Sequence, residues 1–235
     1  MTKTAVFVEG QTELILLREY LLRKFNWSVD IECRRLFREQ FQVAQFDNRI
    51  ETADRHFLLV DIGNDQKVIS ALLEREKGLI KNGYTKIIGL RDMYSREYKD
   101  FRDSIDNAIV TKFINNHSER LQARKSQAVL FFAIMEIEAW ILGLREVLER
   151  LDPKLTTEFI NKELGFDLGV IDPETTRFHP AQDLNNIYEL VGSSYDKHKS
   201  DIEALAKILT CEDYDNLYLS DKCNAFKPFY ETLLQ

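Results

Sequence analysis

The stretch Thr4-Ala5-Val6-Phe7-Val8-Glu9-Gly10-Gln11-Thr12-Glu13, residues 4–13, indicates the fold class of this chain. Its first five residues form an apolar run of β-branched and aromatic side chains, which is typical of a buried strand. Glu9-Gly10 ends the run. A helix is predicted from Thr12, its N-cap, to about Phe25, because leucines recur there at three- and four-residue spacing. A strand, a tight turn and a helix are the usual opening of an open α/β sheet.

Three further apolar runs repeat this pattern along the chain. They cover residues 57–62, 86–90 and 128–134. Helical patterns follow over about residues 65–79 and 103–117, and, after Glu136 and Glu138, to about residue 151. Asp65 is expected to cap the first of these helices. Strands that alternate with helices predict an α/β fold with a mostly parallel sheet flanked by helices and joined by right-handed crossovers.

The predicted secondary structure differs between the first and the last part of the chain. An α/β core is predicted over residues 1–151, and alternating apolar residues within residues 28–55 predict an inserted strand or hairpin. Beyond Asp152-Pro153 the pattern predicts a helical C-terminal part, residues 152–235, packed on the core, with helices over about residues 181–191, 200–209 and 223–234.

Carboxylates stand at the end of every predicted core strand: Glu9, Asp61, Asp92 and the pair Glu136 and Glu138. A single acidic residue in such a place more often caps a helix or a turn, and Asp61 is interpreted as a capping or supporting residue first and a ligand second. Four strand ends that share the feature favour a site, because ligands gather at the carboxyl ends of parallel strands. Clustered carboxylate oxygens suit Mg²⁺.

The segment Val8-Glu9-Gly10-Gln11-Thr12-Glu13 resembles the V-E-G-x-T-E signature of Toprim domains, in particular the stand-alone and OLD-type (overcome-lysogenization-defect) nuclease branch. The resemblance covers the core from about residue 3 to residue 151, and the C-terminal part more loosely. It implies that Glu9 and Glu13, four residues apart, reach one Mg²⁺, with Mn²⁺ as a substitute.

A second motif departs from the usual Toprim pattern. The Asp-x-Asp of these domains is Asp92-Met93-Tyr94 here, so Asp92 is carried over as a ligand and the second aspartate is a tyrosine. Uncharacterised bacterial Toprim-like families pair Asp-x-Tyr with a later Glu-Ala-Trp, which Glu138-Ala139-Trp140 resembles. Glu138 or Glu136 would supply the missing carboxylate. Since two residues that are two apart at a helix start cannot both point the same way, Glu138 is favoured.

Tyr195-Asp196-Lys197 resembles a Tyr-x-Lys of the same families. The resemblance implies that Lys197 stabilises charge on the phosphate, with Lys199 and Lys222 as rivals. The alternative is that Lys197 is a lysine in solvent. Trp140, beside apolar neighbours, is interpreted as a core residue rather than a platform on which bases stack.

These residues predict a Mg²⁺-dependent nuclease that hydrolyses phosphodiester bonds in nucleic acid. The resemblance further implies a role in defence against phage or plasmids, action as a homodimer, and a separately encoded ATPase partner, because this chain has no P-loop pattern. A non-catalytic Toprim-like module that binds nucleic acid or a partner is the alternative. A third hypothesis is a phosphotransfer enzyme or a phosphatase. It is weaker, because the nucleophile motif of such enzymes is absent from the sequence.

Composition narrows the function classes further. The net charge of −7 argues against a basic surface that coats nucleic acid, and the arginines at positions 34, 35 and 38 are interpreted as a solvated face. The three cysteines and four histidines are too scattered for a zinc site. No apolar run approaches the roughly 20 residues of a membrane span, and no signal-peptide pattern opens the chain, so a cytoplasmic location is expected.

Overall fold

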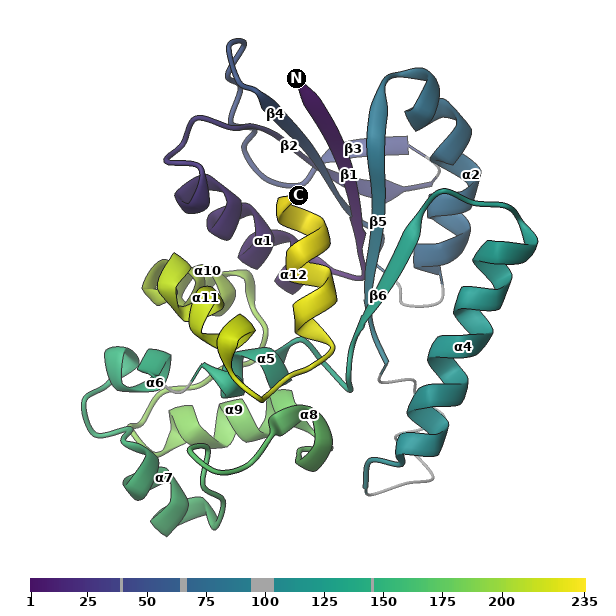
Figure 1. The fold of residues 1–235 in the computed structure, drawn as a ribbon. Coiled ribbons are helices and arrows are strands. Elements are labelled where there is room, and N and C mark those ends of the chain that lie inside the picture. Colours follow the sequence, from purple (N-terminus) through teal and green to yellow (C-terminus); the bar gives the residue numbers. More distant parts are fainter. Residues whose placement is uncertain (39, 64–66, 94–103, 145) are drawn as a thin grey trace. The chain divides into compact units, whose positions relative to one another are not determined.

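The computed structural model describes residues 1–38, 40–63, 67–93, 104–144 and 146–235. Its centre is a six-stranded sheet with the strand order β3-β2-β4-β1-β5-β6 (Figure 1). The strands are β1 (Thr2–Val8), β2 (Asp30–Phe37), β3 (Gln40–Val43), β4 (Arg55–Asp61), β5 (Tyr84–Asp92) and β6 (Val129–Ala133). Strand β1 pairs in parallel with both β4 and β5, and β2 pairs in parallel with β4. The predicted α/β class with a mostly parallel sheet is therefore confirmed.

Residues 28–55, predicted as a strand or hairpin, contain both β2 and β3. The two strands pair antiparallel, with Leu36 opposite Phe41 and Phe37 opposite Gln40. Because β2 also pairs with β4, the hairpin extends the sheet rather than lying apart from it. Strand β3 is the edge strand.

The described helices lie close to the predicted segments and add shorter ones in the C-terminal part. They are α1 (Gln11–Lys24), α2 (Val68–Lys81), α4 (Asn107–Ala123), α5 (Glu138–Gly143), α6 (Glu146–Leu151), α7 (Thr157–Leu164), α8 (Pro173–Thr176), α9 (Pro180–Glu189), α10 (Lys199–Ile208), α11 (Cys211–Leu219) and α12 (Phe226–Leu234). The single helix predicted to extend to about residue 151 is wrong, because α5 ends at Gly143 and a separate helix α6 begins at Glu146. Asp65, the predicted cap of α2, lies outside the described residues.

Contacts divide the chain into two compact units. The first unit comprises Met1–Arg91 and Lys112–Phe131, and the second comprises Asp92–Thr111 and Phe132–Gln235. The boundary predicted after Leu151 is a different division, since the contacts group Phe132–Leu151 with the C-terminal helices. None of the helices in the described ranges has the length and hydropathy to cross a membrane.

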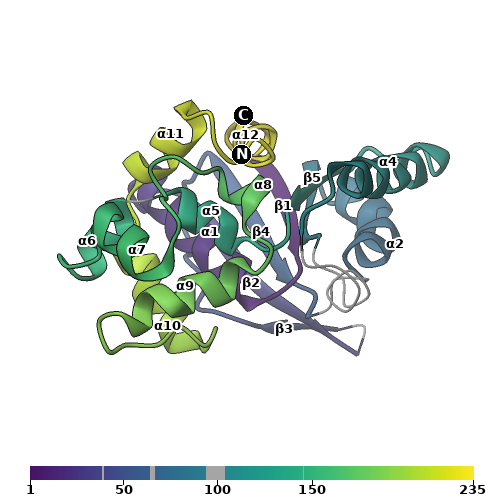
Figure 2. The ribbon, with the colours of Figure 1, turned by 90° about the horizontal axis from the view of Figure 1, so that it is seen from below.

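Apolar side chains on both faces of the strands form the core of the first unit. Alternate residues of β1 and β4, among them Phe7 and Val60, pack with Val68 and Leu72 of α2 in one buried cluster. The intervening residues point to the opposite face because side chains alternate along a strand, and α1 contacts β1, β2 and β4. Helices α1 and α2 lie on opposite sides of these strands (Figure 2).

In the second unit, α5 packs against α8 and α9. Trp140 of α5 is buried, with its ring centroid 5.1 Å from that of Phe226 and 5.7 Å from that of Phe229 in α12. The interpretation of Trp140 as a core residue is confirmed.

Candidate functional site

The end of β1 carries the first part of the predicted motif. Helix α1 is capped by Gly10, not by Thr12 as the sequence predicted. Glu13 Oε2 accepts a hydrogen bond of 3.0 Å from the backbone N–H of Gly10, so this glutamate caps the turn from position N3, while Gly10 has no side chain to make the reciprocal bond. Glu9 is half-buried in that turn and Glu13 is buried. The turn is thereby held rigid directly after the strand.

The parallel register brings the carboxyl ends of three neighbouring strands to one level. Val8 of β1 lies opposite Asp61 of β4 and opposite Leu90 of β5. Glu9 therefore follows a strand whose two neighbours end in Asp61 and Asp92. The sequence predicted that Glu9, Asp61 and Asp92 each stand at the end of a strand. The parallel register explains why these strand ends are neighbours.

Asp61 has partners of its own in the first unit. Its Oδ1 accepts a hydrogen bond of 2.7 Å from Gly63 N, and its Oδ2 lies 3.4 Å from Arg35 Nε. Burial raises the pKa of this carboxyl, while Arg35 and the bond from Gly63 act in the opposite direction. These contacts agree with the interpretation of Asp61 as a capping residue.

The second unit contains a cluster of charges around Lys197. The ammonium Nζ of Lys197 lies 3.1 Å from Glu136 Oε1 and 3.0 Å from Glu138 Oε2. The expectation that Glu136 and Glu138 cannot point the same way is therefore wrong. Helix geometry does not apply between them, because Glu136 precedes α5 and follows Met135, whose φ of 63° turns the chain sharply.

The surrounding backbone and side chains hold this cluster in place. Tyr195 Oη donates to Glu138 Oε1 at 3.0 Å, and the backbone N–H of Ala181 in the first turn of α9 donates to Glu136 Oε2 at 3.2 Å. Asp92 Oδ1 accepts from the backbone N–H of Ile137 at 3.1 Å. Within the second unit, Asp92 thus fixes the turn before α5.

The electrostatics of the cluster keep Lys197 charged. Burial lowers the pKa of Lys197, but the carboxylates of Glu138, Glu136 and Asp92 more than offset this, so the pKa lies above its usual range. Glu138 is fully buried, and burial raises its pKa against the opposing effect of Lys197. Lys197 has a φ of 58°, an uncommon backbone conformation for a residue with a side chain, and such strain is concentrated at functional sites.

Lys197 is distinguished from its two rivals by these contacts. The alternative of a lysine in solvent is wrong, because only 35% of its side chain is exposed and two carboxylates hold its ammonium group. Lys199 pairs with Glu203 on the outer face of α10 at 3.6 Å, and Lys222 donates to the carbonyl oxygen of Leu168.

The donor set of this cluster is suited to a hard divalent cation. Glu136, Glu138 and Asp92 offer carboxylate oxygens, and together they exceed the single positive charge of Lys197. Glu138 Oε2 is buried and pairs with the ammonium group of Lys197 at 3.0 Å. Carboxylate oxygens of this kind are the ligands that Mg²⁺ prefers, but the ammonium group of Lys197 lies between Glu136 and Glu138. Tyr94, the other half of the Asp92-x-Tyr94 motif, lies outside the described residues.

A further group of possible ligand atoms lies beside Lys197: Asp196, His198 and Asp201. Sequence reasoning missed it. Its geometry has a local explanation, because Asp201 Oδ2 accepts from the backbone N–H groups of Asp196 and His198 at 3.0 and 3.1 Å and so caps the start of α10. The group fixes the strained turn that presents Lys197.

Glu174 is a buried acid that sequence reasoning also missed. Its Oε1 accepts from Trp140 Nε1 at 2.7 Å, and its Oε2 accepts from Ala225 N at 2.9 Å. Burial raises its pKa from 4.5 to about 7, although both hydrogen bonds oppose the shift. In the sequence, Asp172-Pro173-Glu174 is an ordinary helix start. Only the burial of Glu174 in the fold identifies it as an unusual acid.

This pKa has a testable consequence for stability. A carboxyl whose folded pKa is raised contributes stability that is complete below its unfolded pKa and is lost as pH rises through the folded value. From pH 5 to pH 8, Glu174 is expected to reduce the free energy of unfolding by about 3 kcal/mol. Glu174→Gln should remove this slope, as measured by urea unfolding followed through tryptophan fluorescence, whereas Glu158→Gln on the exposed face of α7 should keep it. Equal slopes in wild type and Glu174→Gln would contradict the assignment.

Comparison with known proteins adds no relative: no family model, no curated protein and no solved structure matches the chain.

Proposed function

We propose that this protein is a Mg²⁺-dependent nuclease that hydrolyses phosphodiester bonds in nucleic acid. The observation that carries the proposal is the buried ion cluster of Glu136, Glu138 and Lys197, placed directly after a core strand and beside Asp92. Folding stability alone does not explain why two glutamates and a charged lysine are buried together, since buried ion pairs contribute little to stability. Such clusters are more typical of sites that act on charge.

The roles of the residues follow from the resemblance and from their contacts. The resemblance assigns Mg²⁺, or Mn²⁺, to Glu9, Glu13 and Asp92, with Glu138 and Glu136 as helpers. Bound metal would lower the pKa of a water and neutralise charge on the phosphate.

Lys197 would stabilise the negative charge that develops on the phosphate oxygens. Glu136 and Glu138 keep its ammonium group protonated and in position, and Tyr195 fixes the carboxylate of Glu138. A lysine held in this way loses little conformational freedom when a phosphate arrives.

The resemblance also supports a setting for this activity. It favours a cytoplasmic role in defence against phage or plasmids, with a separately encoded ATPase as partner and a homodimer as the acting form. All of these belong to the proposal.

A non-catalytic Toprim-like module is the second candidate. It is favoured by one observation, that Lys197 already neutralises part of the charge on Glu136 and Glu138. A module of this kind would keep a stable ion cluster and bind nucleic acid or a partner without cutting.

Incubation of the purified protein with plasmid, single-stranded DNA and transfer RNA tests the proposal. We expect cleavage in Mg²⁺ or Mn²⁺ and none in EDTA. Glu138→Gln should slow cleavage by about 10²-fold, because Lys197 would lose one of the two carboxylates that fix it. Glu51→Gln, an exposed carboxylate far along the chain from the cluster, should cleave like wild type.

Cleavage that persists in EDTA, or that is equal in Glu138→Gln, would exclude a metal nuclease of this kind. Mg²⁺ binding without cleavage of any substrate would favour the non-catalytic module.

A further inference from the structure

The β2–β3 hairpin exposes an unusual number of large apolar side chains. Phe37, Phe41, Val43 and Phe46 are 48%, 43%, 71% and 85% exposed. Among the residues that the structure describes, they are four of the ten exposed large hydrophobic side chains, within a stretch of ten residues. Single exposed apolar residues need no explanation, but a group of them marks an interaction surface.

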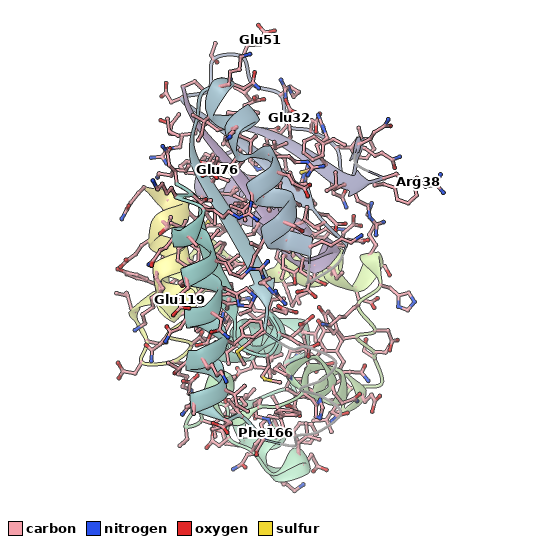
Figure 3. All side chains as sticks on the ribbon, turned by 90° about the vertical axis from the view of Figure 1, so that its right-hand side faces the viewer. Glu32, Arg38, Glu51, Glu76, Glu119 and Phe166 are labelled. Carbon is pink, nitrogen blue, oxygen red and sulfur yellow. The ribbon has the colours of Figure 1, made fainter. Side chains whose placement is uncertain are left out.

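The hairpin places its aromatic rings on both faces of a two-stranded ribbon. Leu36 lies opposite Phe41 and Phe37 lies opposite Gln40, and successive side chains alternate between faces. Phe37 and Phe41 therefore point to opposite faces. The last pair of the β2–β4 register is Arg35 with Asp61, so residues 36–38 project beyond the carboxyl end of β4. Figure 3 shows Arg38 at the outer tip of this projection.

Arginines accompany the aromatic rings. The guanidinium of Arg38 lies 5.1 Å from the ring centre of Phe37, and that of Arg75 in α2 lies 5.6 Å from the ring centre of Phe41. The side chain of Arg35 is 56% exposed although it pairs with Asp61.

The arginines of the hairpin lie toward its tip, since the whole hairpin, residues 30–43, has three arginines and three acidic residues. Residues 34–46 contain three arginines and one glutamate, whereas the chain has a net charge of −7. Arg34 does not contribute to the surface charge, because Asp47 and Glu32 hold it. Arg38, and Arg35 in the exposed part of its side chain, are the cations near the tip that an anion can reach.

We propose that this hairpin binds single-stranded nucleic acid. The hairpin patch consists of exposed residues on both faces and at the tip of this ribbon: Arg35, Phe37, Arg38, Phe41, Val43 and Phe46. Unpaired bases would stack on its phenylalanine rings and phosphates would meet its arginines, the combination by which proteins bind single strands without reading sequence. The inference rests on the proposed function and deepens it, since it names single-stranded nucleic acid as the substrate class.

Two other occupants fit the patch less well. Duplex DNA hides the faces of its bases, so exposed rings gain little from it. A second copy of the chain would pair with the edge strand β3, but β3 has only four residues and a charged tip, features that discourage edge pairing.

The position of the patch connects it with the carboxylates of the first unit. Arg35 contacts Asp61, which ends β4, and Val8 lies level with Asp61 in the neighbouring strand. A strand bound along the hairpin would therefore be led to the sheet edge from which Glu9 follows.

Binding is measured by fluorescence anisotropy with labelled oligothymidylate of about 20 nucleotides, in EDTA so that no cleavage occurs. We expect Phe37→Ala/Phe46→Ala to raise Kd by about 25-fold, since each lost stacking contact costs at least roughly fivefold. Wild-type Kd should rise roughly 7-fold from about 50 to 200 mM salt if two phosphates are engaged, and Arg38→Ala should halve that salt slope. Matched controls are Trp27→Ala, an exposed aromatic near the other end of β2, and Arg124→Ala, an exposed arginine after α4; both should bind like wild type.

Several results would overturn the inference: no binding of the oligonucleotide by wild type, equal binding by the hairpin variants, or tighter binding of a duplex of the same length. A dimer in sedimentation that Phe37→Ala/Phe46→Ala dissociates would instead identify a second copy as the occupant. Because the assay contains EDTA, its outcome is independent of cleavage. Hairpin-dependent binding by a protein that never cuts would contradict the nuclease alone, and cleavage that is unchanged in the hairpin variants would contradict the hairpin alone.

Discussion

Glu9→Gln is expected to lower the rate of metal-dependent cleavage by about 10³-fold, at the upper end of the effect of removing one charge-stabilising group. Glu9 follows β1 directly, and the hydrogen bond from Gly10 N to Glu13 Oε2 holds the turn that presents it. Glutamine keeps the shape of the side chain but removes the charge that a hard cation requires. The loss should exceed that in Glu138→Gln, because Lys197 already neutralises part of the charge of Glu138.

The measurement is the initial rate of cleavage in Mg²⁺ on whichever substrate the wild type cuts. Glu51→Gln is the matched control, since it removes an exposed carboxylate from the same unit. Circular dichroism should show equal folding in both variants. A folded Glu9→Gln protein that cuts at the wild-type rate would remove Glu9 from the proposed site, and with it the resemblance on which the metal assignment rests.

Lys197→Met is expected to lower the free energy of unfolding by about 3 kcal/mol at pH 8, the low end of the cost of breaking a buried pair, because Lys197 keeps some exposure. The cost arises at Glu138, which is fully buried and would lose its cation. Burial already raises the pKa of Glu138, and loss of Lys197 would raise it further.

The pH dependence of this variant follows from the same pKa. A carboxyl with a raised folded pKa contributes less stability as pH rises through that value. Lys197→Met should therefore be closer to wild type at pH 5, where Glu138 can take up a proton, than at pH 8.

Urea unfolding at both pH values measures the effect. Lys199→Met is the matched control, since that lysine makes an exposed pair with Glu203 and its loss should change stability by less than about 0.5 kcal/mol. The double variant Lys197→Met/Glu138→Gln should recover part of the loss, because it no longer buries an unpaired charge. An equal loss at pH 5 and pH 8, without recovery in the double variant, would show that Lys197 acts through packing alone.

Much of the sheet could be predicted from the sequence because strands and helices have distinct hydrophobic periods. The strand before Glu9 and the helix after it were expected within two residues of their observed bounds. The break at Gly143 in the helix predicted to extend to about residue 151 was not, because apolar periodicity continues across it.

The candidate site shows the same division. Acidic residues at strand ends are visible in the sequence, since they follow apolar runs directly. Their partners are not: Asp61 and Arg35 meet only through the parallel register of β2 and β4, and Glu174 meets Trp140 only through packing of the second unit.

Neighbours in the chain were enough to predict the α/β class, the alternation of the core strands with helices, and the carboxylates at the ends of β4 and β5 and directly after β1. Long-range packing, in contrast, brings Glu136 and Glu138 to one ammonium group, that of Lys197 about sixty residues further on. The reason is physical. The direction of Glu136 depends on the φ of Met135, and the charge of Lys197 in a half-buried place depends on carboxylates that folding brings to it.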